Sequence, residues 1–151
     1  MSERSDRAIA LFKSGASCSQ SVVAAYADLF GMDEKTAMLV ASGFGGGMGR
    51  MREVCGVVSG MVILAGLKYG NSESSDAAGK KRVYEVVQKL FAAYKERYGS
   101  YLCRELLGLD KPEGDPKPSE RTAAYYKKRP CAEMVGQGAL MVEQFLLNDS
   151  K

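Results

Sequence analysis

The chain contains no histidine, and that absence removes several kinds of site. Ser-His-Asp and Cys-His catalytic centres need an imidazole base, and zinc sites with histidine ligands and imidazole pH switches need one too. No two cysteines are spaced as C-x-x-C, which also excludes thioredoxin-like motifs and the usual zinc-ribbon knuckles. Any chemistry in this protein must therefore use other side chains.

Long apolar runs and a large charge of either sign are also missing. The longest uncharged apolar run covers residues 54–67, which is shorter than the roughly 20 residues of a membrane-spanning helix. The charged N-terminus precedes no apolar stretch, so we expect no signal peptide. The formal net charge of +3 is too small to indicate binding to nucleic acid or to a membrane surface. We therefore expect a cytoplasmic protein without membrane insertion, whose thiols stay reduced.

The 151 residues predict a single helical domain over 1–151. Apolar residues recur at helical spacing and no strand-like alternation is present, so the fold class should be all-α. We expect one irregular bundle of six or seven helices around a central helix at about 53–67. Gly56 and Gly60 form a small-residue stripe on that helix, which would let another helix approach closely. The expected helices cover about 6–14, 17–30, 33–40, 53–67, 76–98, 100–107 and 130–147.

A glycine-rich segment lies before the central helix, with five glycines between Gly43 and Gly49. Each glycine costs a helix about 1 kcal/mol relative to alanine, so the segment should be a loop. No Gly-Lys-Ser/Thr follows, so it is not a phosphate-binding P-loop. It is either a tight connection or a collar of N–H groups that bonds sulfur or another anion, with Arg50 and Arg52 either solvated or offsetting negative charge. The residues of such a supporting collar would be Gly45, Gly46, Gly47, Gly49, Arg50 and Gly56.

The four cysteines, Cys18, Cys55, Cys103 and Cys131, share one position on the predicted helices. Each falls in or near a first turn and on the apolar side of its helix. Unpaired N–H groups and the helix dipole favour negative charge there, which lowers the pKa of a thiol. Four inward sulfurs from four helices could meet at one point. The alternative is that each cysteine only fills space in the core.

Three motifs resemble one known family. Cys-Ser-Gln-Ser-Val at 18–22, Gly-Phe-Gly-Gly-Gly-Met-Gly-Arg at 43–50 and Glu-Val-Cys-Gly-Val-Val-Ser-Gly at 53–60, followed by two single cysteines, look like the redox-active proteins named for a C…CGAxxG…C…C signature (the C_GCAxxG_C_C family). Val57 departs from the pattern, since the family usually has alanine or cysteine there. The resemblance implies redox work by the four cysteines.

The same signature is similar to part of the split-Soret cytochromes c, whose cysteines are associated with an iron–sulfur cluster beside haem. This chain has no C-x-x-C-H and no histidine, so no haem is expected. We expect electron transfer to an unidentified partner protein through a cluster held by the four cysteines as metal ligands. A metal-free thiol–disulfide protein is the first alternative, and a structural zinc site or a helical interaction domain without chemistry are the others.

Other side chains carry weaker signals. No hydrolytic or group-transfer site is present in the sequence, so the protein would be a redox carrier or an oxidoreductase. The tyrosines at 94, 98, 101, 125 and 126 indicate either the edge of the core or the surface of a homodimer. The Lys-Lys-Arg runs at 80–82 and 127–129 indicate a solvated surface.

Overall fold

The computed structural model describes residues 1–109 and 114–148, and over these residues the chain is all-α, as predicted. The α-helices are α1 (Glu3–Lys13), α2 (Cys18–Tyr26), α3 (Glu34–Ala41), α4 (Gly56–Tyr69), α5 (Ala77–Tyr98), α6 (Cys103–Leu106), α7 (Ala123–Lys128) and α8 (Cys131–Val142). Two 3₁₀ turns, η1 (Ala27–Phe30) and η2 (Ser42–Phe44), and a π-helical turn, η3 (Glu143–Leu147), extend three of them. Extended pairing in the described residues is limited to one isolated bridge between Val54 and Leu102.

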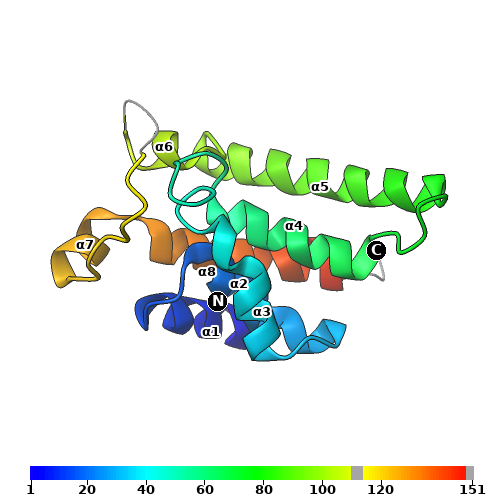
Figure 1. The fold of residues 1–151 in the computed structure, drawn as a ribbon, viewed down its shortest axis with the longest axis horizontal. Helices are drawn as coiled ribbons and strands as arrows, with labels where there is room; N and C mark the ends of the chain where they lie inside the picture. Colours follow the sequence, from blue (N-terminus) through cyan, green and yellow to red (C-terminus); the bar gives the residue numbers. More distant parts are fainter. Residues whose placement is uncertain (110–113, 149–151) are drawn as a thin grey trace.

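Helix α4 lies at the centre of the bundle, as expected for the small-residue helix. It packs against α2, α5 and α8, while α1 packs against α2 and α8 on the other side (Figure 1). Val57, Val58, Met61 and Leu64 of α4 are fully buried. The helix carries no charged residue before Lys68, so most of its surface can face other helices.

Two glycines set how closely α2 approaches α4. A Cβ atom at Gly60 would lie 3.0 Å from Val22 Cβ, and one at Gly56 would lie 3.1 Å from the backbone nitrogen of Ser19. Such contacts are tighter than ordinary van der Waals packing, so a side chain at either position would push the helices apart. The predicted close approach along this stripe is confirmed.

The start of α4 differs from the prediction of residue 53. Arg52 has a left-handed φ of 62°, which no right-handed helix can include. The N–H of Cys55 donates to the carbonyl of Tyr101 over 2.8 Å, which ties this segment to the connection between α5 and α6. The helix therefore begins at Gly56, with Cys55 as its N-cap.

The helix predicted over 100–107 is also shorter than expected. It begins at Cys103, with Leu102 as its N-cap, so the prediction of Ser100 as the cap is wrong. The hydroxyl of Ser100 instead accepts from the N–H of Leu102 and donates to Glu105. Its side chain holds the turn before the helix.

Other boundaries shift for local reasons. The first helix starts at Glu3 because Ser2 and Ser5 form a reciprocal capping box. The segment predicted as one helix over 17–30 changes to a 3₁₀ turn after Tyr26. The sequence missed α7, a six-residue helix that the Thr122 side chain caps.

Among the described residues, no helix combines the length and the apolar character needed to cross a bilayer.

Candidate functional site

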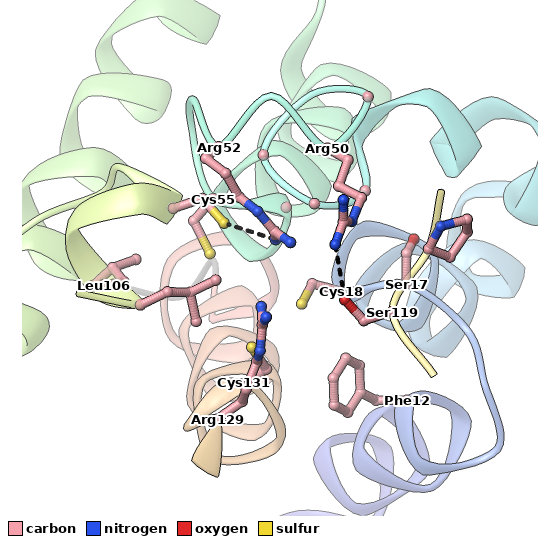
Figure 2. Close-up of a pocket in the computed structure, with 18 of the residues that line it drawn as sticks. Phe12, Ser17, Cys18, Arg50, Arg52, Cys55, Leu106, Ser119, Arg129 and Cys131 are labelled. Atoms are coloured by element: carbon pink, nitrogen blue, oxygen red, sulfur yellow. Dashed lines mark hydrogen bonds between the residues drawn. The ribbon is translucent and has the colours of Figure 1, made fainter. Parts of the chain in front are cut away.

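All four cysteines line one cavity of about 350 Å³ (Figure 2). Cys18, Cys103 and Cys131 are the first residues of α2, α6 and α8, and Cys55 is the N-cap of α4. The structure thus places every cysteine at the start of a helix and brings the four starts together, as the sequence predicted.

Cys18 at the start of α2 and Cys131 at the start of α8 interact, so that each thiol shifts the pKa of the other. The Cys18 thiol, together with the positive charge of Arg129 and Arg121, lowers the pKa of Cys131 to about 7. Interaction with Cys131 and burial raise the pKa of Cys18 well above its ordinary value. At neutral pH the pair therefore holds one thiol and one sulfur that is partly thiolate.

Cys55 and Cys103 lie deeper and have different partners. Cys55 Sγ is 3.4 Å from the hydroxyl of Tyr94, and burial raises the pKa of Cys55 to about 11 against the opposing effect of this bond. Cys103 Sγ accepts from Arg52 Nη1 over 3.6 Å, and burial raises its pKa although Arg52 opposes the change. Both sulfurs are kept protonated by loss of water contact.

The expected lowering of thiol pKa at the helix N-termini is thus wrong for Cys18, Cys55 and Cys103. For Cys55 and Cys103 removal from water disfavours a thiolate more than the helix dipole favours it, and for Cys18 the interaction with Cys131 is the larger cause and burial the second. Cys131 alone follows the prediction, and for it the main causes are Cys18 and nearby guanidinium groups.

The glycine-rich segment is a self-bonded left-handed turn. The five successive residues 46–50 all have φ between 55° and 72°. A non-glycine residue in this region costs roughly 1–2 kcal/mol, and both Met48 and Arg50 occupy it. Five backbone N–H groups, those of Met48, Gly49, Arg50, Arg52 and Glu53, donate to carbonyls of residues 43–47. For these five groups the predicted collar aimed at sulfur is wrong.

The loop and the first residue of α4 nevertheless pack directly on the cysteine-bearing helix starts. A Cβ at Gly47 would lie 2.7 Å from Cys103 Cβ, and one at Gly56 would lie 3.2 Å from Cys18 Cβ. Close backbone approach, rather than N–H donation, explains the glycines here. The six residues predicted as a supporting shell, Gly45, Gly46, Gly47, Gly49, Arg50 and Gly56, all line the cavity.

Arginines from three parts of the chain also line the cavity. Arg50 donates to the Asp115 carbonyl and the Ser119 hydroxyl, over 2.8 and 2.9 Å. Arg121 and Arg129 come from the segment around α7, and Figure 2 shows Arg129 pointing toward the cysteines. The prediction that residues 127–129 are solvated is therefore wrong for Arg129, which is half-buried.

Sequence reasoning did not identify Arg121, Arg129 or Tyr94 as part of this site. Arg129 stands two residues before Cys131, which is a local signal for a cation beside a sulfur. No such signal exists for Arg121, whose backbone partner Phe12 lies 109 positions away. Tyr94 was interpreted as core edge or dimer surface, but it is fully buried.

Comparison with known proteins gives one match. No curated protein and no solved structure matches the chain. One family matches over residues 16–145, a range that contains all four cysteines and the glycine loop. The chain therefore belongs to the C_GCAxxG_C_C family, whose description reads "Putative redox-active protein".

Proposed function

We propose that the protein carries out thiol–disulfide redox chemistry at Cys18 and Cys131. The observation that carries this proposal is that the two partly exposed cysteines line one cavity, where each thiol shifts the pKa of the other. The sequence alone favours a cluster over a dithiol, and this pairing reverses the order.

The lowered pKa of Cys131, beside Arg129 and Arg121, favours it as the attacking sulfur. A thiol with a pKa near the ambient pH combines a substantial thiolate fraction with good nucleophilicity. Both Cys131 and Cys18 are partly exposed, whereas Cys55 and Cys103 are buried. Substrate can therefore reach this pair more readily than it can reach Cys55 or Cys103.

The reaction consumes a disulfide substrate, RSSR. The Cys131 thiolate attacks one sulfur of RSSR, which forms a mixed disulfide and releases RS⁻. Cys18 then attacks the Cys131 sulfur, loses its proton and displaces the second RS⁻, which takes up that proton as RSH. The products are a Cys18–Cys131 disulfide, RS⁻ and RSH, so the substrate gains two electrons and the pair loses them.

Disulfide mapping tests this assignment. The reduced protein is treated with one equivalent of a small disulfide, its remaining thiols are alkylated, and its peptides are mapped by mass spectrometry. We expect a Cys18–Cys131 bond in the wild type and in Cys103→Ser. Cys18→Ser should instead stop at a mixed disulfide on Cys131. A product in which Cys18 and Cys131 stay free while other thiols are oxidised contradicts the assignment.

An iron–sulfur cluster is the second candidate, favoured by the meeting of all four thiols at one cavity. Iron–sulfur clusters are held by four cysteine thiolates, so the donor set fits, and the lining arginines would offset the cluster's negative charge. The protein would then pass electrons to a partner protein. The described residues contain no group of three or more cysteine or acidic side chains arranged to hold a single metal ion, so structural zinc fits less well.

Metal analysis separates these candidates. Protein is prepared without oxygen and assayed for iron, acid-labile sulfide and zinc, together with its visible spectrum. Iron and sulfide in near-stoichiometric amounts, lost in each single cysteine variant, would support the cluster and contradict the dithiol proposal. Metal-free protein that stays colourless after anaerobic reconstitution would exclude the cluster.

A further inference from the structure

We infer that the cavity binds small disulfides that carry carboxylates, held beside Cys131 by Arg129 and Arg121. This inference rests on the proposed function, because it names the substrate class of the same cysteine pair. Its evidence is the charge, the preorganisation and the size of the cavity.

The charge of the lining has one sign. Among the described residues that line the cavity, four are arginines and none is aspartate or glutamate. Walls of low dielectric concentrate such a field and raise the local concentration of ligands of the opposite charge. Guanidinium groups bind carboxylates through two parallel hydrogen bonds, which fixes orientation as well as position.

Arg121 is held in place by uncharged groups. It donates to the carbonyls of Phe12 and Ala16 over 2.9 and 3.1 Å, and its guanidinium carbon lies 4.4 Å from the centre of the Phe12 ring. Carbonyls and an aromatic face fix a guanidinium without cancelling its full charge. Arg121 therefore adds a fixed positive potential to the cavity.

Arg129 adds a second cation next to the reacting sulfur. Its guanidinium carbon lies 5.0 Å from the centre of the Tyr125 ring, and it stands two residues before Cys131. Figure 2 shows its side chain pointing into the space beside Cys131. A carboxylate bound here would bring a disulfide close to the attacking sulfur.

The size and the remaining walls limit what can enter. A cavity of about 350 Å³ is at the lower end of the range for small-molecule sites. Phe12, Leu106 and Met134 provide apolar surface for the carbon part of a ligand. A short acidic disulfide fits this combination of cationic and apolar walls.

A matched series of aliphatic disulfides tests the charge preference. The reduced protein reacts with 3,3′-dithiodipropionate, bis(2-hydroxyethyl) disulfide and cystamine, which are dianionic, neutral and dicationic at neutral pH. Rates of Cys131 modification, measured by mass spectrometry after quenching, are divided by those of the urea-unfolded chain to remove intrinsic reactivity. For the folded protein we expect the normalised rate with the dianion to be about ten times the normalised rate with the dication.

Two variants and a control test whether Arg129 causes that preference. Arg129→Gln should lower the ratio by about fivefold, as expected for loss of one nearby charge, while Arg129→Lys should keep most of it. Arg7→Gln is the control, because Arg7 pairs with Glu34 on the surface and does not line the cavity. Equal normalised rates for all three disulfides would overturn the inference and leave the proposed function standing.

Binding of an unreactive analogue keeps the inference testable without redox chemistry. The thioether 3,3′-thiodipropionate has the two carboxylates but no disulfide, and its binding to the wild type is measured by calorimetry. Binding that weakens in Arg129→Gln supports the inference, and absence of binding overturns it. Failure of Cys131 to react with any disulfide would overturn the proposed function, whatever the calorimetry shows.

Discussion

Arg52 Nη1 donates a hydrogen bond to Cys103 Sγ over 3.6 Å, although 51 positions separate the two residues. The arginine is only 5% exposed, and its backbone has a left-handed φ of 62°. Non-glycine residues keep such a conformation only where their surroundings determine it, and such positions cluster at functional sites. Here the strained backbone aims a buried guanidinium at a buried sulfur.

Replacing that guanidinium should make Cys103 less reactive. Arg52→Met removes both the hydrogen bond and the charge that oppose the burial of Cys103, so the pKa of the thiol should rise further. One pKa unit reduces the thiolate fraction tenfold below the pKa, so alkylation of Cys103 by iodoacetamide at pH 8 should slow by about tenfold. Arg7→Gln is the control, because Arg7 pairs with Glu34 on the surface and has no contact with Cys103 or Arg52. An unchanged rate in Arg52→Met would show that Arg52 does not act on the sulfur.

Gly47 should be essential for stability because it lies against Cys103. Gly47→Ala combines a φ of 72° with a Cβ 2.7 Å from Cys103 Cβ and 2.8 Å from Arg52 Cα. We expect a loss of at least about 2 kcal/mol in the free energy of unfolding, measured with urea. Gly49→Ala is the matched control: its φ of 55° gives a similar backbone cost, but no atom lies within 4 Å of the new Cβ. It should lose only about 1 kcal/mol, and equal losses would show that packing on Cys103 contributes nothing.

The sequence predicts the position of the cysteines better than their chemistry. Ser17 is a recognisable N-cap and Asp76 another, and both accept hydrogen bonds from their first turns as expected. The predicted helix starts, although too early for α4 and α6, were close enough to place every cysteine near a helix N-terminus, and the packing of the helices brings the four together. Burial depends on what covers those starts, so the raised pKa values of Cys18 and Cys55 could not be read from local signals.

The sequence did not predict that arginines from distant parts of the chain line the cavity. Arg129 belongs to a Lys-Lys-Arg run that resembles a solvated turn, and only the packing of α7 shows that it faces inward. The backbone partners of Arg121, Phe12 and Ala16, lie more than a hundred positions away in the sequence. Such contacts follow from tertiary packing, which periodicity and capping motifs do not encode.

Cys131 should titrate near neutral pH, and Cys18 should be the cause. Alkylation of Cys131 should rise through pH 7 and level off above it, because the thiolate is the reactive form. Cys18→Ala removes the neighbouring thiol that lowers the pKa of Cys131, so the midpoint should move upward by about one unit. Cys55→Ala is the control and should leave the midpoint near its wild-type value. A midpoint that stays in place in Cys18→Ala would mean that the arginines alone stabilise the thiolate.

The same shift has a consequence for stability. The pKa of Cys131 is lower in the folded chain than the ordinary thiol value of about 8.5. Ionisation of Cys131 therefore stabilises the fold fully above about pH 8.5. This contribution to the free energy of unfolding is lost as the pH falls through about 7. Urea unfolding of the wild type and of Cys131→Ala between pH 6 and 8 should show a difference in stability that shrinks toward the acid end.

Val57, which departs from the family signature, is accommodated by a glycine on another helix. A Cβ at Gly138 of α8 would collide with Val57 Cγ1, and Val57 is fully buried. The larger side chain on α4 therefore fills the space that a side chain at position 138 would need. Gly138→Ala should lower the free energy of unfolding by about 2 kcal/mol through overpacking.

A double-mutant cycle tests whether the two positions compensate. Val57→Ala alone leaves a cavity and should also cost about 2 kcal/mol. In the double variant Val57→Ala/Gly138→Ala the new methyl group enters the vacated space, so the combined loss in urea unfolding should be smaller than the sum by at least about 1 kcal/mol. Losses that add within about 0.5 kcal/mol would show that α8 adjusts independently of Val57. Substantial coupling would instead mean that a small residue is needed at either position 57 or position 138, but not at both, for α4 and α8 to make this contact.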